Sequence, residues 1–176
     1  MAEACGARTH KRPPDLSRDD VLAIEVIKEQ IRTQPIAVED IIVILQVTCP
    51  LRTAEDIENA YVLFEQHDRK SGVVSVSEYQ KPPELAFRLD GENRLQRCFP
   101  EQFHLLTQKH EKAYRFNTGI AINTAGQYLQ QSDTLGKAPL AYVMPPERGI
   151  DIDYSYQLHI AELLYRERER KHAEQS

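Results

Sequence analysis

The stretch FEQHDRKSGVVSVSEYQ, residues 64–80, decides how the first half of this chain is interpreted. Phe64 is the last apolar residue of an amphipathic segment, and a polar loop with one glycine, Gly72, follows it. Ser75 stands three residues before Glu78, which is the spacing of a capping box at the start of a helix. The stretch therefore predicts a helix, a polar loop and a second helix.

Apolar residues at helical spacing extend this pattern towards the N-terminus. A first helix is expected from about Arg18, and a second over AVEDIIVILQV, residues 37–47. Thr53, with an acid three residues later, predicts the N-cap of a third helix that runs to about Glu65. Together with the helix expected at Ser75, these segments form two helix-loop-helix pairs.

Residues 17–81 resemble a degenerate EF-hand pair. In that family an aliphatic residue two positions after the turn glycine pairs with its counterpart in the other loop. Val74 and Ile36 take these places here, 38 residues apart. The resemblance implies a mainly α fold, with a hydrophobic groove that accepts a helix of a partner protein.

Calcium binding by such a loop requires oxygen ligands that end with a bidentate glutamate. In the register set by the glycine, the first, third and fifth positions are His67, Arg69 and Ser71, and a cationic Arg69 repels calcium. We therefore expect no metal cofactor and interpret Glu78 as a helix cap. The alternative is weak calcium binding by a loop with two extra residues. Its ligands are then Glu65, Asp68, Ser71 and Glu78.

The remaining chain divides by its periodicity. Residues 1–16 are interpreted as a flexible tail, 82–116 as a helical extension, and 117–153 as an extended irregular arm, for which a partly disordered linker is the alternative. Residues 154–176 carry the apolar stripe of an amphipathic helix. The arm and this last helix are expected to bind partner proteins. The predicted anchors are Tyr128, Tyr142, Met144, Tyr154, Leu158 and Tyr165.

Composition and motifs exclude several classes of protein. The net charge of −5, without a basic stripe, argues against a nucleic-acid partner, and no apolar run reaches the roughly twenty residues of a membrane helix. Cys5, Cys49 and Cys98 lie far apart, as reduced thiols of an intracellular protein do, and the last two are expected to pack in the interior. Phosphate-binding loops, zinc motifs and nucleophile elbows are absent, so no enzymatic activity is predicted.

These observations predict a mainly α, non-enzymatic adaptor. Its calcium-independent lobe and its arm are expected to hold partner proteins in a larger assembly, such as the cytoskeletal array of a cilium or axoneme. Two alternatives stay open: a calcium sensor that uses a lengthened second loop, and an accessory subunit of a mitochondrial complex.

Overall fold

A four-stranded mixed sheet is the centre of the fold in the computed structural model, which describes residues 3–104, 106 and 110–175. The sheet has the order β1-β5-β2-β6, and β3 pairs with β4 in a separate hairpin. The strands are β1 (Ile41–Ile44), β2 (Val73–Glu78), β3 (Phe87–Leu89), β4 (Leu95–Arg97), β5 (Tyr114–Thr124) and β6 (Leu140–Val143). The α-helices are α1 (Ala23–Thr33), α2 (Ala54–Gln66), α3 (Ala125–Gln130) and α4 (Ser155–Gln175). Short 3-10 turns lie at Glu3–Cys5, Pro14–Leu16, Pro83–Leu85 and Pro100–Gln102.

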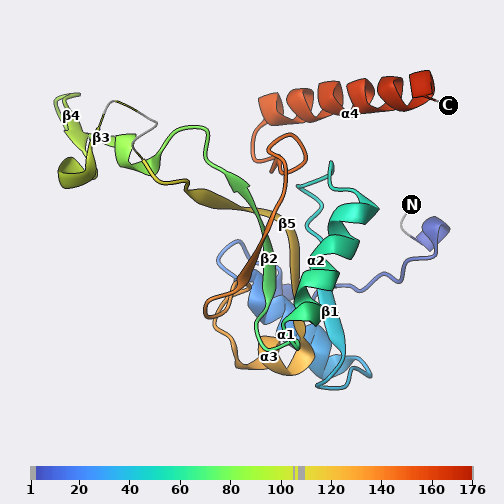
Figure 1. Cartoon of the computed structure of the whole chain (residues 1–176). Helices are drawn as coiled ribbons and strands as arrows, with labels where there is room; N and C mark the ends of the chain where they lie inside the picture. Colours follow the sequence, from blue (N-terminus) through green and yellow to red (C-terminus); the bar gives the residue numbers. More distant parts are fainter. Residues whose placement is uncertain (1–2, 105, 107–109, 176) are drawn as a thin grey trace.

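The strand directions bring several chain segments to one end of the sheet. β5 is antiparallel to both β1 and β2, and β6 is parallel to β2, so β1, β2 and β6 all run the same way. Their carboxyl ends therefore point towards the amino end of β5, which β2 reaches where Glu78 pairs with Tyr114, whereas β1 ends opposite Ala121. We call this end of the sheet the carboxyl edge. The N-terminus of α2 lies at the same end, because α2 runs back from the edge along the sheet (Figure 1).

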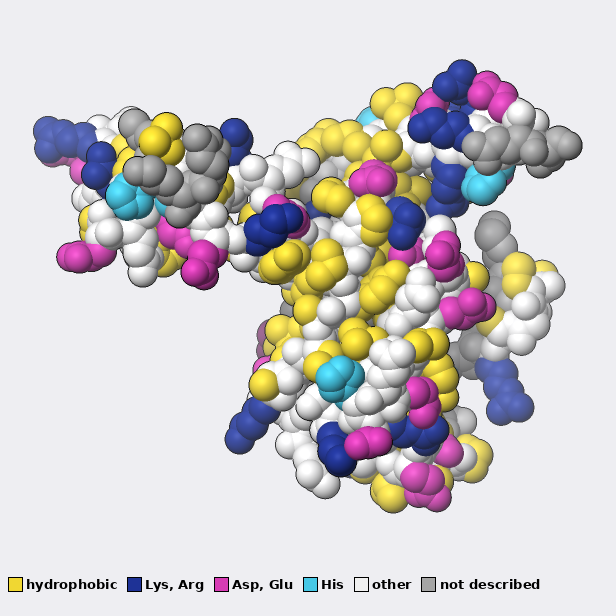
Figure 2. Space-filling view, in the orientation of Figure 1, with side chains coloured by type: hydrophobic (Ala, Val, Ile, Leu, Met, Phe, Trp, Pro, Cys, Tyr) yellow, Lys and Arg dark blue, Asp and Glu magenta, His cyan; other side chains and the backbone are white. Residues whose placement is uncertain are grey.

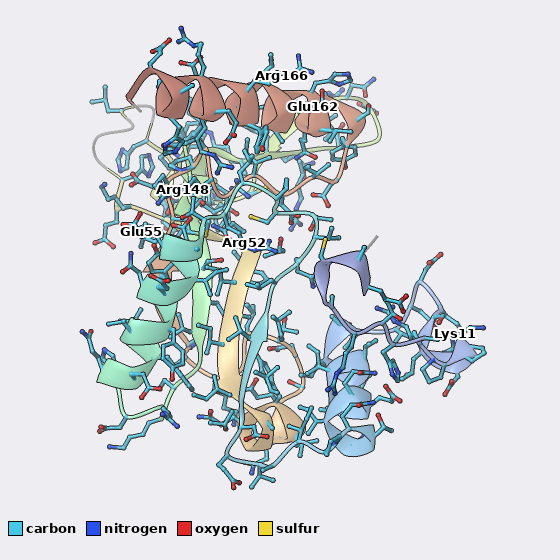
Figure 3. The ribbon with its side chains drawn as sticks, turned by 90° about the vertical axis from the view of Figure 1, so that its right-hand side faces the viewer. Lys11, Arg52, Glu55, Arg148, Glu162 and Arg166 are labelled. Carbon is cyan, nitrogen blue, oxygen red and sulfur yellow. The ribbon has the colours of Figure 1, made fainter. Side chains whose placement is uncertain are left out.

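Helices cover both faces of the sheet, and Figure 3 shows α2 on one side and α1 on the other. Phe64 of α2 is fully buried against Val73 and Ile122 of the central strands. On the other face Ile24 of α1 packs with Tyr128 of α3. Such burial of large apolar side chains contributes about 1.5–3 kcal/mol each.

Two parts extend beyond this layered body. The segment between β2 and β5 carries the β3–β4 hairpin away from the sheet, and α4 lies across the carboxyl edge (Figure 1). Figure 2 shows hydrophobic side chains over the first half of α4 and charged side chains gathered on its C-terminal half. None of the described helices is both long and apolar enough to cross a membrane.

The mainly α fold predicted from the sequence is wrong, because strands stand where two of the four helices were expected. Ile41–Ile44 is β1, and Ser75 lies inside β2 instead of capping a helix. A short run of β-branched residues such as IIVI fits a buried strand as well as a helix, and its stiff side chains favour the strand. The third predicted helix is confirmed as α2, which Thr53 caps through a capping box with Asp56.

The irregular arm predicted over residues 117–153 is also wrong, since it contains most of β5 together with α3 and β6. The helical extension predicted over 82–116 contains β3 and β4, and no α-helix occurs among its described residues; residues 105 and 107–109 lie outside the described part. The C-terminal helix is confirmed as α4. Of the two cysteines expected inside, Cys49 is buried and Cys98 half-buried.

Candidate active site at the carboxyl edge

Five segments meet at the carboxyl edge: residues 45–53 after β1, the end of β2, the start of β5, residues 144–153 after β6, and the N-terminus of α2. In open α/β sheets ligands bind outside the carboxyl ends of the parallel strands. The segments at this edge carry arginine, aspartate and buried polar side chains.

A buried polar network ties β2 to β5. The Oγ of Ser75 donates a hydrogen bond to Oδ1 of Asn117 at 2.5 Å, and Nδ2 of Asn117 donates to Oγ of Ser77 at 2.9 Å. The backbone N–H of Ile120 donates to Oγ of Ser75 at 2.7 Å. All three side chains are fully buried. Because a buried polar group without a partner costs about 1–3 kcal/mol, the three side chains specify one arrangement of the two strands.

This network surrounds an irregularity in β5. Val74 pairs with Ala121 but Val76 pairs with Phe116, so residues 117–120 bulge out of the ladder. Within the bulge Thr118 has φ +58°, a left-handed conformation that is strained for a β-branched residue. Such strain costs about 1–3 kcal/mol and is found mainly at functional sites, where the surroundings enforce it.

The segment after β6 is fastened to the edge at several points. The N–H of Ile152 donates to the carbonyl of Thr48 at 2.8 Å, and the guanidinium of Arg115 donates to the carbonyl of Gly149 at 3.1 Å. Gly149 is buried so close to β2 and β5 that a Cβ there would lie 2.1 Å from Oγ of Ser77. These contacts fix residues 149–152 against the ends of the strands.

Asp56 joins this segment to α2. Its side chain has no exposed surface and accepts from the N–H and Oγ1 of Thr53, from the hydroxyl of Tyr142, and from the guanidinium of Arg148 through Nε and Nη2. Burial raises the pKa of Asp56, but the hydrogen bonds from Arg148, Thr53 and Tyr142 outweigh it and hold the pKa below the ordinary value. Asp56 is therefore ionised and paired at neutral pH.

The buried thiol of Cys49 lies among charged side chains of the edge. Burial raises its pKa; the nearby cation of Arg52 lowers it, the carboxylate of Asp151 raises it, and Arg115 lowers it. Arg52 donates to the carbonyls of Gln46 and Cys49 at 2.5 and 2.6 Å, contacts that orient the guanidinium without neutralising it. The cations of Arg52 and Arg115 and the carboxylate of Asp151 thus all act on this thiol.

Asp151 and Asp153 are the carboxylates suited to a divalent cation. Asp151 is half-buried, Asp153 is exposed, and both flank the anchored Ile152. Mg²⁺ is commonly held by one or two carboxylates together with substrate phosphates, so a pair is a sufficient protein contribution. Among the described residues no group of three or more His, Cys, Asp or Glu forms a closed metal site. The pair therefore fits an ion that is bound together with a phosphorylated ligand.

Cavities separate the edge from α4. One of about 690 Å³ lies between the end of β2, the segment after β6, and Ile160 and Leu164 of α4. A second, of about 280 Å³, lies on the Leu51 side under Arg168. Figure 3 places Arg52, Glu55 and Arg148 at the N-terminal end of α2, facing the helix that carries Glu162 and Arg166, whereas Lys11 lies apart in the N-terminal segment. The larger cavity has the size of a small-molecule site.

The four residues considered for calcium do not come together. Glu65 pairs with Arg69 and Asp68 pairs with Lys70 near the start of β2, where half-buried Ser71 also lies. Glu78 lies at the other end of this six-residue strand, about 17–20 Å away, and pairs with Lys112. His67, assigned to the first ligand position, is the C-cap of α2.

The six predicted partner anchors fall into two groups. Tyr128 and Met144 are fully buried in the core, and burial raises the pKa of Tyr128 well above its usual range. Tyr142 belongs to the Asp56 contacts. The second group is Tyr154, which precedes α4, and Leu158 and Tyr165 of α4. These three side chains keep much of their surface exposed, and their role as anchors stays a prediction.

Comparisons with known proteins point to one class of enzyme. The chain is 27% identical over 171 residues to an N-acylneuraminate cytidylyltransferase of Escherichia coli, covering 97% of this chain and 40% of that protein. It is 30% identical over 142 residues to an N-acylneuraminate cytidylyltransferase of Streptococcus agalactiae, covering 81% of this chain and 34% of that protein. A pseudaminic acid cytidylyltransferase of Campylobacter jejuni is 24% identical over 144 residues, covering 82% and 60%. The chain thus spans less than half the length of the first two relatives. No protein-family profile matches it.

These relatives contradict the prediction of a non-enzymatic adaptor, because every one of them is named for a transfer reaction. They also contradict the predicted absence of enzymatic activity and the predicted partners in a cytoskeletal or ciliary assembly. The calcium-sensor and mitochondrial alternatives are contradicted for the same reason. The names of the relatives specify small-molecule chemistry instead.

The sequence interpretation missed the residues of the carboxyl edge. Asp151, Asp153, Arg148 and Asn117 lie in the segment that was interpreted as irregular, so they were not considered for a site. One signal was available. Two aspartates alternate in GIDID, residues 149–153, and Mg²⁺ is usually bound by one or two carboxylates together with substrate phosphates.

Proposed function

We propose that this chain carries the acidic edge of a cytidylyltransferase site, which transfers a cytidylyl group from CTP to an acidic sugar. The observation that carries the proposal is that the carboxylate of Asp151 and the cations of Arg52 and Arg115 all act on the thiol of Cys49 at the carboxyl edge, with Asp153 on the other side of the anchored Ile152. The similarity to cytidylyltransferases over most of the chain supports it.

The reaction follows from the names of the relatives. A hydroxyl of the sugar acid attacks the α-phosphorus of CTP, a new O–P bond forms, and the bond between the α-phosphorus and the bridging oxygen breaks. Pyrophosphate leaves and the hydroxyl proton passes to water. Negative charge builds up on the phosphate oxygens, so a competent site places cations there and keeps them fixed.

The residues of this chain meet that demand in two ways. Arg52 and Arg115 are held by backbone carbonyls, which leaves their charge available for phosphate or carboxylate groups. Asp151 and Asp153 would hold Mg²⁺, which neutralises phosphate charge and orients the nucleotide. The cavity of about 690 Å³ next to Arg115 offers space for the sugar acid.

The test is a transfer assay. The purified chain is incubated with CTP, Mg²⁺ and either an N-acylneuraminate or pseudaminic acid, and the release of pyrophosphate and the nucleotide sugar are measured. We expect release that requires the acceptor. Asp151→Asn should lower the rate by at least about tenfold, because even outer-shell changes at metal sites cost 10–100-fold.

Asp68→Asn is the matched control, since it removes an exposed carboxylate at the opposite end of the sheet. Its rate should equal that of the wild type. Acceptor-dependent release that is unchanged in Asp151→Asn would place the chemistry elsewhere, and no release with either acceptor would contradict the proposed function.

A further inference from the structure

We infer that the ion pair between Asp56 and Arg148 is a positioning device for Asp151 and Asp153, so that the buried end of α2 sets where these carboxylates stand. The inference rests on the proposed function as far as the carboxylates' role is concerned. The geometry of the pair is independent of it.

The pair joins two elements that are distant in the sequence. Arg148 donates to Asp56 through Nε at 2.9 Å and through Nη2 at 2.8 Å, a two-pronged contact that fixes the plane of the guanidinium. Asp56 is itself fixed, because the same carboxylate closes the capping box of α2 with Thr53 and accepts from Tyr142 of β6. A rigid acceptor thus holds the head of Arg148.

The distance along the chain makes this contact relevant to the site. Asp151 follows Arg148 by three residues, which span at most about 10 Å when fully extended. On the far side Ile152 is anchored to Thr48 at 2.8 Å. Asp151 is therefore held from both sides: Arg148, fastened to α2, and Gly149, fastened by Arg115, precede it, and the anchored Ile152 follows it.

The pair is a poor device for stability alone. Removing a carboxylate from water costs several kcal/mol, and apolar residues in place of a buried ion pair are often equally stable. Arg148 also keeps 32% of its side chain exposed while Asp56 has none. What an ion pair does supply, and an apolar contact does not, is a single orientation. That property serves the placing of a metal ligand.

Three variants separate positioning from folding. Arg148→Met removes the pair and leaves the capping box of α2 intact. Arg148→Lys keeps the charge and loses the two-pronged contact. Asp68→Asn is the control, since it breaks an exposed pair with Lys70 at the opposite end of the sheet.

Two readouts are needed, and both use the full chain. The first is hydrogen exchange of the Ile152 amide by NMR, which reports whether the segment stays docked without any ligand. The second is the affinity for Mn²⁺ in the presence of CTP, measured by electron paramagnetic resonance. In Arg148→Met we expect Ile152 to exchange at least about tenfold faster and Mn²⁺ to bind about 10–100-fold more weakly, with Arg148→Lys between it and wild type.

The outcomes are distinct. Unchanged Ile152 exchange in a folded Arg148→Met variant would overturn the positioning role, and so would unchanged Mn²⁺ affinity. Should the wild type bind no Mn²⁺ with CTP, the proposed function fails while the exchange of Ile152 still decides whether Arg148 holds the segment. If Arg148→Met does not fold, Arg148→Lys takes its place in both measurements.

Discussion

Buried polar side chains, more than apolar ones, define the carboxyl edge at the scale of single residues. Asn117 bridges Ser75 and Ser77, and the next residue, Thr118, has a strained left-handed conformation. The same side chains leave no room beside Gly149. One extra methyl group at that position therefore tests whether the segment after β6 is seated as described.

Gly149→Ala should destabilise the protein by at least about 2 kcal/mol, because its Cβ would meet Ser77 and Asn117 at distances that no packing tolerates. Urea denaturation measures the free energy of unfolding. Gly91→Ala is the matched control: nothing lies within 4 Å of its added Cβ, and its stability should change by no more than about 0.5 kcal/mol. Equal stability of the two variants would mean that Gly149 is not buried in the network.

Single residues also show how far the sequence predicts the site. Thr53 and Asp56 were identified as a cap from their spacing alone, because a capping box is local. Ser75 and Glu78 have the same spacing, yet Ser75 faces Asn117, 42 residues away. A local rule cannot distinguish these cases, since the partner that decides between them is distant in the sequence.

At the scale of elements, the N-terminus of α2 is the rigid part to which the edge is attached. Asp56 has a lowered pKa in the folded protein, so its ionised form is bound more tightly there than in the unfolded chain. The stability that it contributes is present above its ordinary pKa of 3.8 and is lost as the pH falls through the lower, folded pKa.

Asp56→Asn should therefore lower the free energy of unfolding by about 2 kcal/mol at pH 7, a value typical of hydrogen bonds to charged groups. The difference from wild type should shrink once the pH falls below about 4. Urea denaturation of both proteins at pH 7, 4 and 3 measures it. A difference that stays constant over this range would show that the charge of Asp56 does not matter to folding.

Elements also explain why the fold was mispredicted. The helices α1, α2 and α4 were predicted because their apolar spacing, and for α2 a capping box, lie within a few turns of the chain. β1 and β2 are short apolar runs whose partner, β5, follows much later in the chain. Without that partner, nothing in Ile41–Ile44 distinguishes a buried strand from part of a helix.

At the scale of the whole molecule, the sheet collects residues from positions 46 to 153 at one edge, and α4 closes over it (Figure 1). Arg168 of α4 donates to the carbonyl of Leu51 at 3.1 Å, which ties the helix to the same edge. The opposite end of the sheet holds the exposed turn with Asp68 and Lys70. We therefore assign ligand binding to the carboxyl edge and not to the opposite end of the sheet.

The most direct test is an NMR titration of the isotope-labelled chain with CTP and Mg²⁺. We expect chemical-shift changes for the amides of Cys49, Arg115, Asp151 and Asp153 at the carboxyl edge, and none for Lys70 and Gly72 at the opposite end. Asp151→Asn should weaken the titration by at least about tenfold. Shifts confined to the opposite end, or no shifts at saturating nucleotide, would contradict the assignment of the site.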